Sequence, residues 1–290
     1  MIDLHTHSTA SDGTFSPVSL MQEAKRVGLN TIALTDHDTI DGCEEARSEA
    51  KRLGIRFIAG CEIAIDWHYD DSASLTQDSS FKHREFHLLA LDIKTPSGGF
   101  LSMMEELKTM RYTRNLIIIE KMKEMGVMCN YEDLLSDANN GVIGRPHFAK
   151  FLVEQKKAKT IQVAFDKYLG RGKSLYVEKE CVDLQKAITC IKDSGALPFL
   201  AHPSTLYVSW GKLPQILSML RDQGIVGIEA YHPLLNKNQA QRMEEIARTL
   251  GMFVSAGSDF HGISRKDRKL GYTSGGIKIE DKWMPPPLLI

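Results

Sequence analysis

The sequence lacks the features that would direct it to a membrane, a disulfide scaffold or duplex nucleic acid. No apolar run approaches the ~20 residues that span a bilayer, and the amino terminus has no signal-peptide pattern. The five cysteines are widely spaced and form no C-x-x-C pair, so we expect reduced thiols in a cytoplasmic protein. A formal net charge of −1 provides no basic surface for duplex nucleic acid or for a membrane.

The chain instead contains short apolar segments that end in histidine or carboxylate residues, and it has ten histidines in all. Seven such segments are predicted to be strands: residues 1–7, 31–38, 56–62, 85–91, 197–202, 225–232 and 252–261. In α/β proteins, the carboxyl ends of parallel strands are where sites are built. The pattern therefore predicts one convergent cluster of nitrogen and oxygen ligands, which is a multinuclear metal site.

Amphipathic helices alternate with these strands. The first covers residues 17–27, with Ser16 as its N-cap, Pro17 at its first position and Gly28 as its left-handed C-cap. Such alternation predicts an α/β fold with a parallel sheet and crossover helices. Because ligands come from both the first and the last strand, a closed barrel is favoured.

The alternation stops between about residues 100 and 180, where the segments 101–126, 131–138, 146–154 and 160–169 are predicted to be helical. We therefore expect a barrel built from residues 1–99 and 181–290, with residues 100–180 as a helical insertion that caps the substrate side. Residues 67–84 are polar and rich in turn formers, which predicts a flexible loop that holds His68 and His83 at the surface.

Several candidate ligands have a plain alternative when each is taken alone. His5 and His7 lie two apart, so on a strand their side chains point the same way, although such a pair also occurs among surface and core histidines. Asp12 fits either a metal ligand or a turn residue. His37 is flanked by two acids that suit partners of a ligand.

Two further carboxylates strengthen the case for a metal site. Glu62 follows a buried apolar run, where a carboxylate needs a cation or a hydrogen-bond donor to offset its desolvation. Asp259 and His261 again place two ligand types two residues apart.

Taken in order, these motifs resemble the PHP (polymerase and histidinol phosphatase) superfamily of metal-dependent phosphoesterases. The chain is most similar to the stand-alone branch with nucleoside 3′,5′-bisphosphate phosphatases and a related 5′-to-3′ exoribonuclease. The matching segments span nearly the whole chain: Asp3 to His7, Ser11 to Gly13, Thr35 to Thr39, Gly60 to Ile63, His87, Gly144 to His147, Ala201 to Pro203 and Gly257 to His261.

The resemblance implies a distorted (β/α)7 TIM-like barrel with a helical insertion and three metal positions. The first position would be held by His5, His7, Glu62 and Asp259, the second by Asp12, His37 and His261, and the third by Glu62 as a bridge with His87 and His202. All of these residues are present, which argues against a degenerate copy.

Imidazole and carboxylate ligands suit two to three divalent transition metals, with Mn²⁺ preferred and Fe²⁺ or Zn²⁺ as alternatives. We expect a metal-bridging hydroxide, held by Glu62, Asp259 and His261, to attack phosphorus. Arg145 and His147, at the start of a predicted helix, are expected to bind substrate phosphate, although a surface arginine beside a helix cap is the alternative. His232 fits substrate contact and a capping role equally well.

The favoured function is hydrolysis of a phosphate monoester of a small nucleotide, such as a nucleoside 3′,5′-bisphosphate. Alternatives are a 5′-to-3′ exonuclease on short RNA and a histidinol-phosphate-type phosphatase. An amidohydrolase also begins with two histidines on its first strand, but that class often bridges its metals with a strand-end lysine, and no predicted strand ends in lysine. A non-catalytic, metal-stabilised interaction domain is disfavoured because the ligand set is complete.

Overall fold

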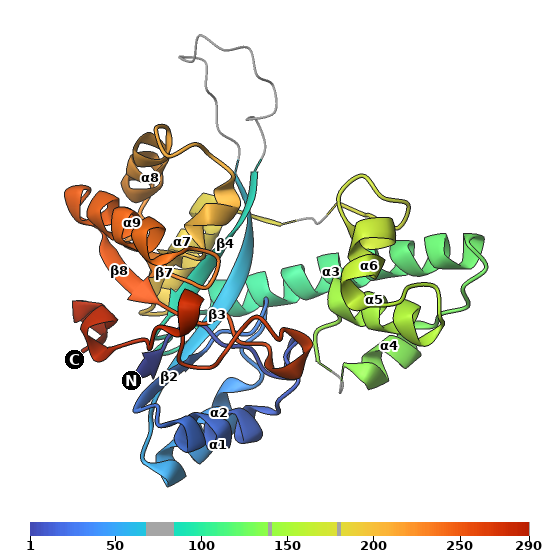
Figure 1. Ribbon diagram of the computed structural model, residues 1–290, viewed down its shortest axis with the longest axis horizontal. Helices are drawn as coiled ribbons and strands as arrows, with labels where there is room; N and C mark the ends of the chain where they lie inside the picture. The colour runs from blue at the N-terminus through green and yellow to red at the C-terminus, as the bar shows by residue number, and fades with distance from the viewer. Residues whose placement is uncertain (68–83, 139–140, 179–180, 290) are drawn as a thin grey trace.

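The computed structural model describes residues 1–67, 84–138, 141–178 and 181–289. Its sheet has the strand order β1-β2-β3-β4-β6-β7-β8, with β5 paired to β3 at the side. The strands are β1 (Ile2–Asp3), β2 (Thr31–Leu34), β3 (Arg56–Trp67), β4 (Arg84–Leu91), β5 (Val182–Asp183), β6 (Leu197–Leu200), β7 (Gly227–Tyr231) and β8 (Phe253–Ala256). Figure 1 shows this sheet curving around the centre of the larger part of the molecule.

The first and last strands lie side by side, so the sheet is nearly closed. The Leu4 N–H donates to the Ala256 carbonyl at 3.2 Å, and the Asp259 N–H donates to the His5 carbonyl at 3.0 Å. Beyond the strands proper, Thr6 and Phe260 form a parallel bridge. These contacts confirm the predicted α/β barrel, and they bring the two ends of the candidate ligand set together.

Strand β4 runs antiparallel to both of its neighbours, so the prediction of an all-parallel sheet was wrong at this strand. Strand β3 continues past Glu62 to Trp67, and His87 on β4 pairs with Ala64 on β3. Because β4 runs in the opposite direction, its amino-terminal half reaches the rim at which the parallel strands end. His87 therefore arrives at the same rim from within a strand rather than from a strand end.

Five helices alternate with the strands and pack against the outside of the barrel (Figure 1). They are α1 (Pro17–Val27), α2 (Cys43–Leu53), α7 (Leu184–Asp193), α8 (Leu213–Asp222) and α9 (Lys237–Thr249). Helix α1 has the predicted limits, because the Ser16 hydroxyl accepts a hydrogen bond from the Ser19 N–H and Gly28 adopts φ 85°. Only glycine takes this left-handed conformation at little cost.

The helical insertion extends to one side of the barrel and has a hydrophobic core of its own (Figure 1). It contains α3 (Gly98–Glu124), α4 (Tyr131–Asp137), α5 (Arg145–Glu154), α6 (Ile161–Ala164) and a π-helical turn (Phe165–Leu169). Helix α3 belongs to both parts. Phe100 and Leu107 in its first half pack in the barrel core, whereas Ile118 and Met122 in its second half pack in the insertion core.

Within the described ranges, no helix has both the length and the apolar character needed to cross a membrane. All five cysteines lie within the described ranges and none of them forms a disulfide, and three (Cys61, Cys129 and Cys190) are buried. The predicted surface positions of His68 and His83 lie outside the described residues.

Candidate metal centre

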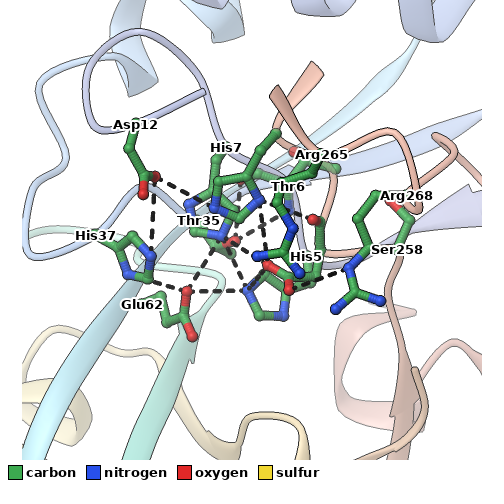
Figure 2. A network of polar contacts seen from close by, with 12 residues as sticks. His5, Thr6, His7, Asp12, Thr35, His37, Glu62, Ser258, Arg265 and Arg268 are labelled. Carbon is green, nitrogen blue, oxygen red and sulfur yellow. Dashed lines mark hydrogen bonds and ion pairs between the residues drawn. The ribbon is translucent and has the colours of Figure 1, made fainter. Parts of the chain in front are cut away.

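The residues predicted as metal ligands converge on one rim of the barrel, although they come from seven separate chain segments. Figure 2 shows His5, His7, Asp12, His37 and Glu62 with their imidazole and carboxylate groups directed toward a common centre. His5 and His7 follow β1, and their Nε2 atoms lie 3.1 Å apart with both side chains fully buried. The alternation of side chains along an extended segment accounts for this shared direction.

Glu62 lies at the middle of the cluster and uses its two carboxylate oxygens on different sides. Its Oε1 atom lies 2.7 Å from His87 Nδ1 and 2.8 Å from His202 Nε2. Its Oε2 atom lies 3.1 Å from both His5 Nε2 and His37 Nδ1. A carboxylate arranged in this way can bridge two cation positions.

Asp259 and Asp12 complete the cluster on its other sides. Asp259 Oδ1 lies 3.4 Å from His7 Nε2 and 3.5 Å from His261 Nδ1. Asp12 Oδ1 lies 3.3 Å from His261 Nε2 and 3.9 Å from His37 Nε2. Both carboxylates therefore face imidazole nitrogens rather than solvent.

The arrangement fits divalent metal ions. Three groups have donor atoms within 4.8 Å of one another: His7 with Asp12, His37 and His261; His5 with His7, Glu62 and Asp259; and His37 with Glu62 and His87. Two donors that bind one ion at about 2.1 Å are themselves about 3.0–3.4 Å apart, close to most spacings given above. In addition, His7 Nδ1 and Asp12 Oδ1 are buried without a hydrogen-bond partner among the described residues.

The electrostatics of the cluster also favour cations. Burial opposes charge on Glu62, yet the surrounding histidines hold the pKa of its carboxyl well below the ordinary value. Burial likewise opposes a proton on His7, but its contacts with Asp259 and Glu62 prevail and raise its pKa to about 10. The pKa of His5 is raised by Glu229 and Glu62, against the effect of burial. In the metal-free chain, protons on His5 and His7 thus offset part of the charge of the buried carboxylates.

Strained backbone accompanies these residues. His202 adopts φ 27° and Asp259 adopts φ 52°, and Asp38, next to His37, adopts φ 53°. Such conformations are costly for residues other than glycine and concentrate at functional sites.

Glu229 is a site residue whose role was missed at the sequence level. Its Oε1 atom lies 3.0 Å from His5 Nδ1, and its Oε2 atom accepts a hydrogen bond of 2.8 Å from the His202 N–H. With Nδ1 held in this way, His5 presents Nε2 to the centre, which is the usual arrangement of a carboxylate behind a metal-binding histidine. Glu229 lies in an apolar strand, where an isolated carboxylate is costly, and this position could have indicated its role from the sequence.

The two acids beside His37 were predicted to act as partners of that ligand, and in the structure both contact the surrounding segments. Asp36 accepts hydrogen bonds from the Ser8 N–H at 2.7 Å and from the Ser11 hydroxyl at 2.6 Å, which fixes the segment that leads to Asp12. Asp38 accepts a hydrogen bond of 2.7 Å from Arg111 Nε on α3. The second contact ties the insertion helix to the segment that carries His37.

The predicted phosphate-binding residues, Arg145 and His147, lie at the start of α5 in the insertion, and both have contacts within that insertion. The Arg145 guanidinium lies 5.9 Å from the centre of the Tyr176 ring within the insertion, and His147 Nδ1 accepts a hydrogen bond from the Gly144 N–H. A Cβ atom added to Gly144 would lie 3.9 Å from Asp12 Oδ2, so the start of α5 adjoins the cluster.

His232 is fully enclosed beside Asp259. Its Nε2 atom lies 3.4 Å from Asp259 Oδ2, and its Nδ1 atom accepts a hydrogen bond of 3.1 Å from the Leu234 N–H. The second bond caps a turn after β7, which supports the capping alternative.

Metal binding should release protons and should strengthen as the pH rises. Because the pKa of His5 is raised well above its ordinary value and that of His7 to about 10, these two rings hold protons in the metal-free protein at neutral pH. A metal ion must displace those protons, so its affinity should keep increasing with pH until His7 loses its proton near pH 10. Calorimetric titration with Mn²⁺ in buffers of different ionisation enthalpy measures the protons released. A pH-independent affinity with no proton release would contradict this charge balance.

The sequence matches the PHP domain family over residues 3–180, which is more than half of the chain. It is 32% identical over 259 residues to a 5′-3′ exoribonuclease of Haemophilus influenzae, with 89% of each chain covered. It is 27% identical over 273 residues to a 3′,5′-nucleoside bisphosphate phosphatase of Chromobacterium violaceum, covering 94% of this chain and 91% of the relative.

A solved structure from Bifidobacterium adolescentis, described as a metal-dependent phosphoesterase, shares the fold with a TM-score of 0.80. It is 25% identical in sequence, and the match covers 97% of this chain and 93% of that one. All three names describe enzymes that cleave phosphate esters.

Proposed function

The chain belongs to the PHP domain family and is a metal-dependent phosphoesterase, and from this premise we propose that it hydrolyses a phosphate monoester of a small nucleotide. A nucleoside 3′,5′-bisphosphate is the substrate class that we favour. The family match confirms the membership predicted from the order of the sequence motifs. The observation that carries the proposal is the convergence of His5, His7, Asp12, His37, Glu62, His87, His202, Asp259 and His261 on one buried centre.

Two to three divalent ions fit this centre, and Mn²⁺ is the preferred candidate, with Fe²⁺ or Zn²⁺ as alternatives. His5, His7, Glu62 and Asp259 would hold one ion, and Asp12, His37 and His261 would hold a second. Glu62 Oε1 with His87 and His202 would hold a third. When bound, such ions lower the pKa of coordinated water and neutralise phosphate oxygens.

The chain's own residues prepare the centre by fixing which histidine nitrogens face it. His5 Nδ1 lies beside Glu229, and His202 Nδ1 lies 3.0 Å from the Thr205 hydroxyl. His261 Nδ1 lies 2.8 Å from the Asp259 carbonyl, to which it donates as Nδ1–H. In each ring the proton on Nδ1 leaves the Nε2 lone pair directed at the centre.

The charge of the loaded centre selects the substrate. The three carboxylates Asp12, Glu62 and Asp259 carry −3 when ionised, and two or three divalent ions leave a net charge between about +1 and +3. A phosphate dianion offsets this charge, whereas a neutral amide does not. Phosphate ester hydrolysis is therefore favoured over cleavage of C–N bonds.

A substrate with a second phosphate is favoured because of Arg145 in the helical insertion. The start of α5 adjoins Asp12, and Arg145 supplies a half-buried guanidinium at this position. A guanidinium grips phosphate oxygens with two parallel hydrogen bonds. Rotation away from Tyr176 would allow Arg145 to meet a phosphate that remains on the nucleoside after the first is cleaved.

Replacement of Arg145 by alanine tests this preference. Loss of a charge-assisted contact typically lowers kcat/KM about ten- to a hundredfold. We expect that loss for adenosine 3′,5′-bisphosphate and little change for p-nitrophenyl phosphate, with Mn²⁺ content unchanged. Arg171→Ala, an exposed arginine elsewhere in the insertion, is the matched control. Equal losses on both substrates would place Arg145 on the phosphoryl group that is transferred, and no loss on either would remove the case for a bisphosphate.

A second candidate function is 5′-to-3′ exonuclease action on short RNA. The exoribonuclease of Haemophilus influenzae is 32% identical to this chain, which is the specific observation in its favour. A short 5′-phosphorylated oligoribonucleotide, assayed beside adenosine 3′,5′-bisphosphate, separates the two candidates. Stepwise mononucleotide release at a higher kcat/KM than that for the bisphosphate would favour the exonuclease.

A further inference from the structure

Arg268 is a buried arginine at the edge of the metal centre, in the segment that follows β8. Figure 2 shows it beside Ser258, on the opposite edge of the network from Asp12 and His37. Its side chain is 3% exposed, and its Nε atom has no hydrogen-bond partner among the described residues. Two carboxylate oxygens approach it at longer range: Asp259 Oδ2 lies 3.7 Å from Nε, and Asp267 Oδ2 lies 3.6 Å from Nη1.

A buried guanidinium without hydrogen bonds is energetically costly. Asp259 offers limited compensation, because its carboxylate already faces His5, His7, His232 and His261. Metal ions at the centre would draw further on the same carboxylate. Because neither Asp259 nor Asp267 comes within hydrogen-bond distance, the charge and donors of Arg268 suit a further anion.

We infer that Arg268 is a substrate-binding residue whose guanidinium holds the phosphoryl group that is cleaved at the metal centre. The planar guanidinium carries five N–H donors in a fork that matches phosphate oxygens. Nε lies near Asp259 and Nη1 lies near Asp267, both beyond hydrogen-bond distance, so the N–H donors of the fork remain for the anion. This assignment rests on the proposed phosphoesterase function and adds to it a residue from the last strand's loop.

Arg145 and Arg268 would then bind different phosphates of the substrate. Arg145 lies beyond Asp12 and would bind the phosphate that stays on the nucleoside, whereas Arg268 lies beyond Asp259 and would bind the phosphate that leaves. Loss of Arg268 should therefore affect every phosphate monoester, including p-nitrophenyl phosphate. Loss of Arg145 should affect substrates with a second phosphate.

The test uses the Mn²⁺-loaded protein with Arg268→Met and Arg268→Lys, and Lys266→Met as the matched control. Lys266 is an exposed cation two residues away in the same segment. We expect Arg268→Met to lower kcat/KM about ten- to a hundredfold on both p-nitrophenyl phosphate and adenosine 3′,5′-bisphosphate. The inhibition constant for inorganic phosphate should rise by a similar factor. Arg268→Lys, which keeps the charge without the fork, should lie between, and Lys266→Met should match the wild type.

Two readouts distinguish phosphate binding from support of Asp259. Mn²⁺ content should be the same in wild type and in both Arg268 variants, and low concentrations of guanidinium should restore part of the turnover of Arg268→Met but leave Lys266→Met unchanged. Wild-type phosphate inhibition in Arg268→Met, or Mn²⁺ loss in both variants, would overturn the inference. If the wild type cleaves no phosphate ester, the proposed function fails. The role of Arg268 is then decided by calorimetry, which compares the affinity of the wild type for inorganic phosphate with that of Arg268→Met.

Discussion

Replacing Glu62 by glutamine should lower turnover by about a thousandfold or more, because a loss of about 4 kcal/mol in transition-state stabilisation corresponds to that factor. The carboxylate meets histidines with both oxygens, His87 and His202 through Oε1 and His5 and His37 through Oε2. Glutamine keeps the size of the side chain but replaces one oxygen with an NH₂ group, which cannot bind a metal ion. It also removes one negative charge from a buried site.

The measurement pairs turnover with elemental analysis of metal content. Glu62→Gln should bind at least one ion fewer per chain than the wild type after loading with Mn²⁺ and desalting, while its circular dichroism spectrum stays native. Glu44→Gln, at an exposed position on α2, is the control and should behave as wild type. Full metal content and full turnover in Glu62→Gln would mean that Glu62 does not bridge metal positions.

Most of the barrel could be predicted from the sequence because its signals are local. Helix α1 has a capping serine, a proline at its first position and a terminal glycine, and each of these fixes the backbone within a few residues. The candidate ligands were also predictable in part, since histidines and carboxylates at the ends of apolar segments are costly to bury without a function.

The direction of β4 was not predicted, although the sequence held a relevant signal. Two parallel strands need a crossover of a dozen or more residues, usually a helix, whereas antiparallel strands need only a loop. The sequence between Trp67 and Arg84 is polar and shows no helical periodicity, which does not predict a crossover helix. Weighing that segment against the general alternation would have favoured the antiparallel pairing that the structure shows.

Other features depend on contacts between distant segments and have no local signature. Arg111 meets Asp38 across 73 positions of the sequence, and Glu229 meets His5 across 224. Neither pairing follows from spacing or periodicity. The buried position of Arg268 likewise depends on how the segment after β8 folds back on the rim, and the sequence around it reads as an ordinary charged loop.

Replacing Asp259 by asparagine should also reduce turnover by about a thousandfold, on the same energetic grounds, while leaving the fold stable. Its carboxylate is directed at His5, His7, His232 and His261, so it serves the centre rather than the surrounding backbone. His7→Ala should give the same pattern of lost turnover and retained fold. Near-wild-type turnover in both variants would mean that the ligand assignment is wrong.

Asp3 is another buried aspartate at this rim, but it is expected to stabilise the fold rather than to take part in the reaction. It accepts hydrogen bonds from the Ser258 N–H at 2.9 Å, the Ser258 hydroxyl at 2.5 Å and the Gly271 N–H at 2.7 Å. In Asp3→Asn, an amide NH₂ would face one of these donors, so the free energy of unfolding should fall by about 1–3 kcal/mol. Turnover per folded molecule should remain near that of the wild type. Denaturant unfolding and turnover, measured on Asp259→Asn and Asp3→Asn together, therefore separate chemistry from structure, and equal losses of both quantities in the two variants would show that Asp259 acts through the fold.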